Sequence, residues 1–297
     1  MLNDLVKYNE QYRRPLIEAL TFKGYDVSEV GILERKPKLP ILAIKLYFKR
    51  NDLVFSSNLK SNAFALLFSR SPKVVIVNGL GRHRKKRSLR FVFRKLIGLR
   101  TNSFAIVQNY ADYRYIKRYC PNVKAAWLPG SGGTYKKKGE NNSVLVVQRD
   151  SKIAAVAPSI NDFLVNQGQT TPLVVVGCKD SSLLNKLFPE ILFRSTGYVE
   201  GADIFSKGSI FLQPTGYGEG FPHTLADAIV SDMGIYISNK EYIRYGLWLI
   251  GAKREHIAPG WSRMTWDVNL PDRLHSSNIV ERTLNIVESH VLDSYPE

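Results

Sequence analysis

The chain has 297 residues, of which 44% are hydrophobic and 23% are charged, and its formal net charge is +16. This composition is typical of a globular protein long enough for two domains, and it excludes a disordered chain. The longest apolar runs, such as residues 63–68, are far shorter than the ~20 residues that a membrane-spanning helix needs. The charge indicates an anionic partner, which could be nucleic acid, an acidic membrane surface or phosphorylated small molecules.

The first residues and the cysteines indicate a compartment. The N-terminal residues mix charged and polar side chains and contain no apolar signal-peptide core. Cys120 and Cys178 are too few for a disulfide framework, and we interpret both thiols as small core residues. We therefore expect a cytoplasmic protein.

Strand-like and helix-like segments alternate along the first half of the chain. Continuous apolar runs predict buried strands, and amphipathic runs predict helices. In chain order we expect a helix over 15–20, strands over 25–27 and 52–55, a helix over 58–68, strands over 73–77 and 103–107, a helix over 111–119 and a strand over 125–128.

A polar run over 135–142 interrupts this pattern, reads as a linker, and is followed by a second series of the same kind. We assign residues 239–266 only loosely. The second series comprises strands over 144–147 and 172–176 with a helix over 153–166, then strands over 210–212 and 235–237 with a helix from about 222 to 230.

Such alternation predicts parallel sheets with helices on both faces. The fold class is therefore α/β, with two Rossmann-like domains facing a cleft. We place a compact first domain at 1–138 and a second domain at 139–297, and we leave open whether the last helix crosses back to the first domain.

The stretch GYGEGFPHTLAD, residues 216–227, follows the strand over 210–212. Parallel α/β sheets bind ligands beyond the carboxyl ends of their strands. Pro222 suits the first helical position, and the free N–H groups of the helix that begins there would bind an anion. Gly218 and Gly220 allow a ligand close to the backbone, while Glu219 and Asp227 could accept hydrogen bonds from its hydroxyls. On spacing alone, Glu219 as a simple capping residue remains an alternative.

This stretch resembles the E-x7-E motif of retaining glycosyltransferases of family 4, which have the GT-B fold; Asp227 stands where the family has its second Glu. The resemblance covers most of residues 50–240 and implies transfer of a sugar from a nucleotide donor. It places the acceptor on the first domain and the nucleotide sugar on the second. Four further stretches resemble family segments in the same order: WLPGSGG (127–133), VVQRDSKI (146–153), PLVVVG (172–177) and STGYVEGADIFSKGSIFLQPT (195–215).

The resemblance also implies roles for individual residues. Glu219 would lie against the donor sugar, and Asp227 would hold the ribose. Asn78 stands where many members have a His near the sugar. The other residues with implied roles are Arg149 and Lys152 at the diphosphate, Tyr198 and Val199 at the base, Gly79 and Gly81 near the donor phosphates, and Gly218, Gly220, Phe221, Pro222, Thr224 and Leu225 in the turn and helix start that contact the donor.

We expect chemistry without a metal or another cofactor, because no D-x-D motif and no Cys/His cluster with zinc spacing occurs. Arg149, Lys152 and the helix start at 221–225 could stabilise the charge that develops on a leaving diphosphate. For Arg149 a surface salt bridge is the alternative. We assign no catalytic base: the resemblance implies that the leaving phosphate takes the proton of the acceptor and that Glu219 positions the sugar.

Residues 81–100 hold nine of the chain's Lys and Arg residues beside an apolar side. A helix of this kind suits the surface of an anionic membrane. The alternative is a helix that packs on its own sheet and leaves its basic face in solvent. The residues assigned to a membrane or acceptor surface are Arg82, Arg84, Lys85, Lys86, Arg87, Arg90, Arg94 and Lys95.

The leading hypothesis is an enzyme of cell-surface polysaccharide synthesis on the inner face of the membrane. It would transfer a sugar from a UDP-sugar to a saccharide or a polyprenyl-diphosphate-linked acceptor. One alternative is a sugar-nucleotide epimerase of the same fold, which needs carboxylates in both domains; Asp112 is the obvious one in the first. Another is a nucleic-acid-binding protein that uses residues 82–100. That segment lacks a recognisable binding module and interleaved stacking aromatics, so we expect no nucleic acid as partner.

Overall fold

The computed structural model describes residues 1–34, 36–49, 52–81, 102–167, 172–199, 201, 203–215 and 220–292. The chain forms two compact units, each made of separate stretches of sequence. Unit 1 holds the described residues up to Ser131, the pair Gly220 and Phe221, and residues 276–292. Unit 2 holds the described residues from 132 to 215 and residues 222–275. The boundary proposed from the sequence falls later, after Lys138.

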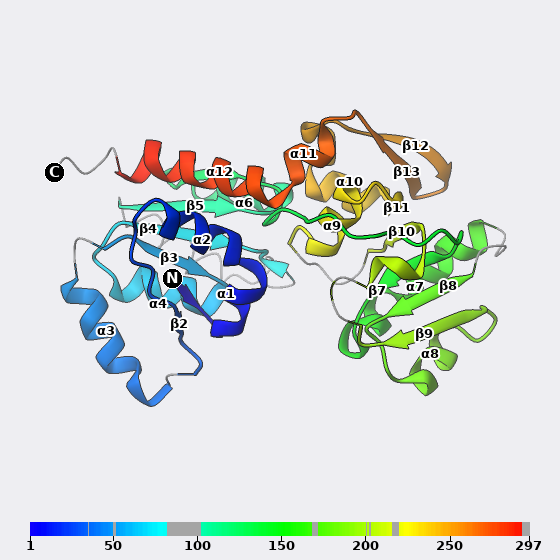
Figure 1. Ribbon diagram of the computed structural model, residues 1–297, viewed down its shortest axis with the longest axis horizontal. Helices are drawn as coiled ribbons and strands as arrows, with labels where there is room; N and C mark the ends of the chain where they lie inside the picture. Colours follow the sequence, from blue (N-terminus) through cyan, green and yellow to red (C-terminus); the bar gives the residue numbers. More distant parts are fainter. Residues whose placement is uncertain are drawn as a thin grey trace. The chain divides into compact units, whose positions relative to one another are not determined.

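Within the described residues, the sheet of unit 1 has six parallel strands in the order β2-β1-β3-β4-β5-β6 (Figure 1). Every residue of β3, β4 and β5 is buried, as expected of parallel strands that are covered on both faces. The strands are β1 (Leu2–Asn3), β2 (Val30–Gly31), β3 (Val54–Ser57), β4 (Lys73–Val77), β5 (Ser103–Val107) and β6 (Lys124–Trp127).

Helices cover both faces of this sheet. Alternate residues of each strand point to opposite sides, and the central strands β4 and β5 carry apolar residues on both sides, so both faces have to be covered. Helices α2 and α12 lie on one face, where Leu284 of α12 packs in a cluster with Ile76 of β4. Helices α4 and α6 lie on the other, where Ile116 of α6 packs in a cluster with Val75. The helices of unit 1 are α1 (Val6–Tyr12), α2 (Arg14–Phe22), α3 (Leu39–Phe48), α4 (Leu59–Phe68), α6 (Tyr110–Tyr119) and α12 (Ser276–Val287), with short turns of 3-10 helix at Lys36–Lys38 and π-helix at Glu288–Leu292.

The sheet of unit 2 has the order β12-β13-β11-β10-β7-β8-β9. Its five strands from β11 to β9 pair in parallel, and β12 and β13 form an antiparallel hairpin on the β11 edge. The strands are β7 (Val144–Val147), β8 (Leu173–Val176), β9 (Phe193–Gly197), β10 (Ile210–Gln213), β11 (Gly234–Ser238), β12 (Ala252–Ala258) and β13 (Trp261–Trp266).

The longest helix of unit 2, α7, packs Ile153, Ile160 and Phe163 into one core cluster with residues of β7 and β8. This cluster sets the start of α7 at the carboxyl end of β7. The helices of this unit are α7 (Asp150–Asn166), α8 (Ser181–Leu187), α9 (His223–Val230), α10 (Asn239–Tyr245) and α11 (Leu270–Leu274), with 3-10 turns at Phe205–Lys207 and Leu247–Ile250.

The predicted alternation of strands and helices is confirmed, although one predicted strand is wrong and several elements were not predicted, among them β1, β9, α1, α8, α10 and α11. The strand expected at 25–27 is wrong: residues 25–29 have no regular structure, and the short strand β2 lies further on. Helix α3 and the hairpin of β12 and β13 were not predicted. α3 is apolar on all sides, so it shows no helical period, and the hairpin strand β12 is mostly polar. None of the described helices is long and apolar enough to span a bilayer.

Candidate functional site

Two basic side chains lie at the start of α7, which follows β7 at the carboxyl edge of the unit 2 sheet. Arg149 is the N-cap residue of α7 and is exposed, and Lys152 lies in the first turn and is half-buried. Burial and, after it, repulsion from Arg149 lower the pKa of Lys152 to about 8. The free N–H groups of a helix start add a partial positive charge. The two basic side chains and the helix N–H groups could together bind an anion.

The loop after β8 is tied to the same helix start. The Oδ1 atom of Asp150 accepts hydrogen bonds from the Cys178 Sγ at 2.7 Å, the Lys179 N–H at 2.9 Å and the Asp180 N–H at 3.1 Å. These bonds, that of Cys178 first, lower the pKa of Asp150. Burial, followed by the bond to Asp150, raises the pKa of Cys178 to about 12, so the thiol stays protonated at neutral pH.

The end of β9 lies at the same edge of the sheet. The N–H of Gly177, after β8, donates to the carbonyl of Gly197 at 2.6 Å, and Gly177 has a φ of +92° that favours glycine. Tyr198 follows with its side chain 75% exposed, and Val199 is partly exposed. The residues predicted for the base therefore follow β9 and those predicted for the diphosphate follow β7, at the same edge of one sheet and on either side of β8.

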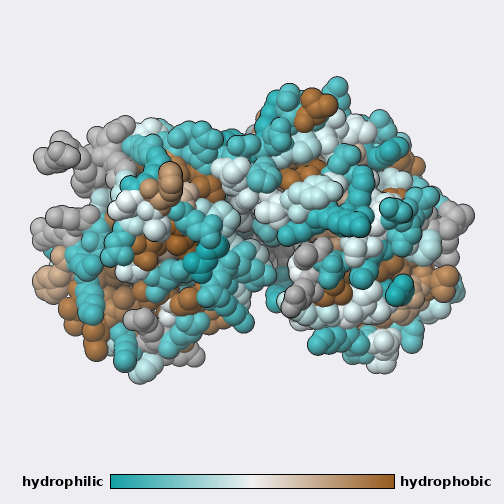
Figure 2. Space-filling view, in the orientation of Figure 1, coloured by the Kyte–Doolittle hydropathy of each residue, from teal (hydrophilic) through white to brown (hydrophobic). Residues whose placement is uncertain are grey.

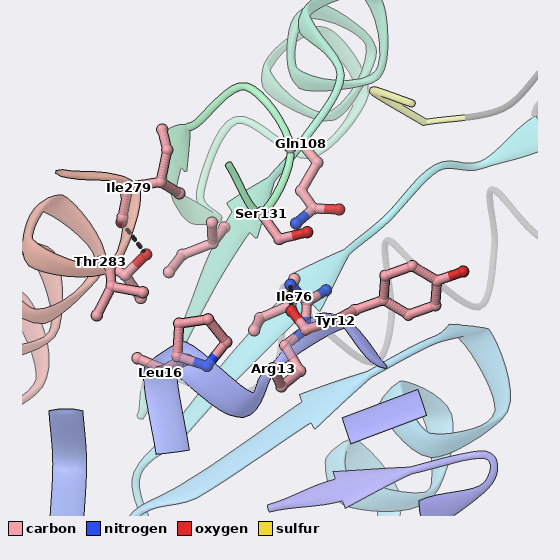
Figure 3. A pocket seen from close by; sticks show the side chains of 12 residues that line it. Tyr12, Arg13, Leu16, Ile76, Gln108, Ser131, Ile279 and Thr283 are labelled. Atoms are coloured by element: carbon pink, nitrogen blue, oxygen red, sulfur yellow. Dashed lines mark hydrogen bonds between the residues drawn. The ribbon is translucent and has the colours of Figure 1, made fainter. Parts of the chain in front are cut away.

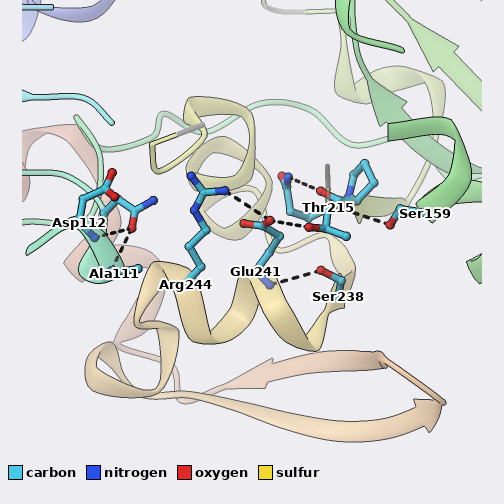
Figure 4. Close-up of polar contacts among 10 residues, drawn as sticks. Ala111, Asp112, Ser159, Thr215, Ser238, Glu241 and Arg244 are labelled. Carbon is cyan, nitrogen blue, oxygen red and sulfur yellow. Dashed lines mark hydrogen bonds and ion pairs between the residues drawn. The ribbon is translucent and has the colours of Figure 1, made fainter. Parts of the chain in front are cut away.

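The glycine-rich turn itself lies partly outside the described residues: Gly216, Tyr217, Gly218 and Glu219 are among those not described. The structure describes its start, which is firmly held (Figure 4). The Thr215 Oγ1 donates to the Glu241 Oε1 at 2.7 Å, and the Thr215 N–H donates to the Ser159 Oγ at 3.1 Å. Arg244 lies 3.5 Å from the same carboxylate. Helices α7 and α10 therefore both anchor the residue from which the turn begins.

Beyond the turn, α9 begins at His223 and Pro222 is its N-cap. The sequence predicts Pro222 as the first helical residue, so the helix begins one position later than expected. Thr224 is half-buried and Leu225 is fully buried, so a ligand at this end could contact Leu225 only through its backbone.

Asp227 is buried and already has protein partners. Its Oδ1 accepts from the Thr134 N–H at 2.7 Å, and its Oδ2 lies 3.8 Å from the His223 Nε2. Gly133 passes so close to α9 that a Cβ there would lie 2.4 Å from the Ala226 carbonyl carbon. In the structure Asp227 therefore fastens the 132–136 segment to α9, and contact with a ribose stays a prediction.

The remaining predicted donor residues lie in unit 1, beyond β4. Gly79 is exposed and Gly81 has a φ of +53°. A Cβ on Gly220 would lie 1.4 Å from the Asn78 carbonyl oxygen, so the backbones of the two segments touch and no side chain fits. The structure thus brings Gly220 to the loop that holds Gly79.

Two other predictions concern residues of this unit. Asp112 is buried and its Oδ2 accepts a hydrogen bond from the Leu80 N–H at 2.8 Å, so this carboxylate holds the loop after β4. The basic residues from Arg82 to Lys95 lie outside the described part of the chain. Among the described residues, no group of three or more His, Cys, Asp or Glu side chains could hold a metal ion.

Comparisons with known proteins rest on structure. No protein-family model and no curated protein sequence matches the chain. A glycosyltransferase from Rickettsia africae superposes with a TM-score of 0.58 at 10% identity, over 99% of this chain and 98% of that one. The pneumococcal O-GlcNAc transferase GtfA, solved with UDP and GlcNAc, superposes with a TM-score of 0.53 at 14% identity. TarM of S. aureus, solved with UDP and alpha-GlcNAc-glycerol among its ligands, gives 0.53 at 11%.

The chain spans only part of two of these proteins. It covers 59% of GtfA and 57% of TarM, while 85% and 86% of this chain are matched. At these identities the likeness defines the fold. The predicted fold class is confirmed: the chain has the α/β GT-B fold of glycosyltransferases, built from two Rossmann-like units.

Proposed function

We propose that the chain is a glycosyltransferase that uses a UDP-sugar as donor. The observation that carries the proposal is the pair Arg149 and Lys152 at the start of α7, at the ligand-binding edge of a sheet whose fold recurs in glycosyltransferases. Two of the similar structures, GtfA and TarM, were solved with UDP, which supports UDP as the nucleotide.

The cations would act on the leaving group. In the transfer, the bond from the sugar C1 to the donor phosphate breaks, and a bond from C1 to an acceptor hydroxyl oxygen forms. Negative charge grows on the diphosphate, and Arg149, Lys152 and the α7 N–H groups are placed to stabilise it without reorganisation. The departing phosphate takes the hydroxyl proton, in a retaining and metal-independent reaction. Glu219 positions the sugar, and Tyr198 contacts the base.

The acceptor we propose is a saccharide or a polyprenyl-diphosphate-linked sugar of cell-surface polysaccharide synthesis. A lipid-linked acceptor requires the enzyme at the inner face of the membrane, and unit 1 carries a surface that suits it. Ile44 and Phe48 of α3 are 57% and 74% exposed, and no residue of α3 is buried. In Figure 2 brown, hydrophobic atoms gather over α3 at the lower left. The α3 patch consists of Ile41, Ile44, Tyr47 and Phe48 of α3 with Leu59, Leu67 and Phe68 of the neighbouring helix α4.

Charge around the α3 patch favours an anionic lipid surface as its occupant. Three exposed lysines lie nearby: Lys38 is the N-cap of α3, Lys45 lies on α3 and Lys60 lies on α4. The guanidinium of Arg70 lies 3.7 Å from the centre of the Tyr47 ring. Exposed apolar side chains with basic residues around them bind anionic membranes through both the hydrophobic effect and electrostatic attraction.

The epimerase alternative has less support, since it needs an acid or base in unit 1 and Asp112 is buried and hydrogen-bonded to the backbone. The deciding experiment measures UDP binding and sugar transfer on the same variants. Glu219→Gln should lose most transfer and keep UDP affinity, because only the sugar end is changed. Arg149→Ala should lose both, with UDP affinity reduced roughly 10- to 100-fold, the effect of a charge-assisted hydrogen bond.

Lys186→Ala is the control, because Lys186 is an exposed cation of the same unit on α8. UDP binding that is as tight in Arg149→Ala as in the Lys186→Ala control would contradict the proposal. Interconversion of two UDP-sugars without transfer would favour the epimerase. Tight binding of DNA without UDP binding would favour a nucleic-acid-binding protein.

A further inference from the structure

A narrow pocket lies at the carboxyl edge of the unit 1 sheet. It contains about 20 Å³ that a water molecule can enter, too little for a sugar ring. Its polar lining includes Arg13, between α1 and α2, Gln108, which follows β5, and Ser131, beyond β6, together with the hydroxyl residues Tyr12 and Thr283 (Figure 3). Apolar side chains such as Ile76 form the remaining wall.

Arg13 is a buried cation with neutral partners. It is 5% exposed, and burial lowers the pKa of its guanidinium to about 10, so it remains charged at neutral pH. Its Nη2 donates to the Asn78 Oδ1 at 2.6 Å and to the Ser57 Oγ at 3.1 Å. Its Nε is buried, and no residue in the described part of the chain accepts a hydrogen bond from it. Among the described residues, no carboxylate forms an ion pair with Arg13.

Asn78 is held by a row of hydrogen-bonded amide side chains, which we call the amide relay. The Asn78 Nδ2 donates to the Asn58 Oδ1 at 2.8 Å, and the Asn58 Nδ2 donates to the Asn3 Oδ1 at 2.6 Å. Asn3 donates in turn to the Asn9 Oδ1 at 2.9 Å. The amide relay turns the Asn78 oxygen toward Arg13 and contributes no negative charge. A buried charge that lacks a counter-charge is costly, and a bound anion removes that cost.

The location fits a substrate. Asn78 and Gly79 form the loop after β4, and Gly220, from the glycine-rich turn, touches the Asn78 backbone. We propose that Arg13 binds a phosphate group of a ligand at this edge of unit 1, its planar guanidinium meeting phosphate oxygens with the Nε–H and an Nη–H. The pocket volume suits an oxygen atom of such a group. The site itself does not depend on sugar transfer; naming its phosphate as that of a lipid-linked acceptor rests on the proposed function.

The test uses the full chain with Arg149→Ala and Lys152→Ala, which removes the phosphate-binding cations of unit 2. Pyrophosphate is titrated at constant ionic strength while thermal unfolding and calorimetry are followed. We expect saturable binding that weakens at least tenfold on adding Arg13→Gln. Arg14→Gln is the matched control, because the neighbouring Arg14 is 43% exposed and pairs with Glu29 at the surface. Arg13→Lys keeps the charge but loses the planar guanidinium with its paired N–H donors, so it should bind pyrophosphate with intermediate affinity.

A direct measurement covers the case in which Arg13→Gln does not fold. The NMR signal of the Arg13 Nε–H, identified by its loss in Arg13→Lys, should shift on addition of pyrophosphate. No shift and no saturable binding in the protein that lacks the unit 2 cations would overturn the proposal. UDP affinity, measured with Arg149 and Lys152 intact, separates the sources: an unchanged value in Arg13→Gln assigns the site to the acceptor phosphate, and a reduced value assigns it to the donor. Both results are independent of whether transfer occurs.

Discussion

At the scale of single residues, the charge state of Lys152 links burial to function. Its folded pKa, about 8, lies below the value of 10.5 for a free lysine. Between these two pH values the unfolded chain holds more protons than the folded one, so folding stability rises with pH in that window. Below pH 8 the cost of keeping the charge half-buried is fully present. A bound diphosphate offsets this cost only while the lysine is protonated.

We therefore expect UDP affinity to fall as the pH rises from 7 to 9, through the pKa of Lys152. In Lys152→Arg the dependence should flatten, because arginine stays charged throughout this range. Calorimetric titration at several pH values measures it, with Lys186→Arg as the control that keeps the wild-type profile. A profile in Lys152→Arg as steep as that of wild type would show that another group controls binding.

Sequence patterns could not separate Arg13 from Arg14. The two are adjacent, have the same chemistry and lie at the start of the same helix, α2. Only the path of the chain across the ends of β3 and β4 buries one beside Ser57 and Asn78 and leaves the other at the surface. The position of Arg149 and Lys152 after a continuous apolar strand and at a helix start could be predicted from the sequence, and their role at a diphosphate stays a prediction.

At the scale of elements, α3 differs from the other helices of unit 1. α2, α4 and α6 each bury two or more residues, whereas α3 buries none and presents the α3 patch. Its sequence, LPILAIKLYF, is apolar at almost every position and so gave no periodic signal. Strands such as β4 and β5 were predictable because a parallel strand buried on both faces needs an unbroken apolar run.

Ile41→Asp together with Ile44→Asp should weaken binding to anionic vesicles at least tenfold. Each change removes an isoleucine whose burial contributes about 1.5–3 kcal/mol and adds a like charge to that of the lipid. Co-sedimentation with anionic and with neutral vesicles measures the effect. Leu192→Asp is the control, since Leu192 is 82% exposed in unit 2.

Equal pelleting of the α3 double variant and wild type would exclude the α3 patch as the lipid contact. The variant with Arg84, Lys85, Lys86 and Arg87 neutralised then tests the basic segment: near the membrane each charge contributes on the order of 1 kcal/mol at low salt. High salt should weaken the contribution of those charges and leave that of the α3 patch largely unchanged, because screening acts on charge alone.

At the scale of the whole molecule, the chain leaves unit 1 after Ser131, returns to it briefly at Gly220 and Phe221, and rejoins it with α12. Figure 1 shows α12, in red, beside strands coloured blue to green that precede it by more than half the chain. Leu284 and Val287 of α12 complete a cluster with Leu16 and Phe104 on one face of the sheet. The fold of unit 1 therefore depends on residues at the far end of the sequence.

Leu284→Ala should destabilise unit 1 by about 2–5 kcal/mol, the usual cost of removing a buried leucine side chain. Amide hydrogen exchange in β4 and β5 measures this unit separately, which matters because two units need not unfold together. Glu281→Ala, at an exposed position of α12, should change stability by no more than about 0.5 kcal/mol. Unchanged protection of β4 and β5 in Leu284→Ala would mean that α12 is dispensable for the sheet.

The sequence by itself determined the α/β class, most of the parallel strands and the cationic start of α7, because local apolar runs and helix starts depend on near neighbours in the chain. It also supplied the glycines, such as Gly220, that the close backbone contacts require. The tertiary structure alone decided that Asp227 has Thr134 as a partner, that no residue of α3 is buried, that α12 completes unit 1 and that Arg13 is buried with neutral hydrogen-bond partners. Each of these depends on contacts between residues distant in the sequence, and periodicity and spacing carry no information about such contacts.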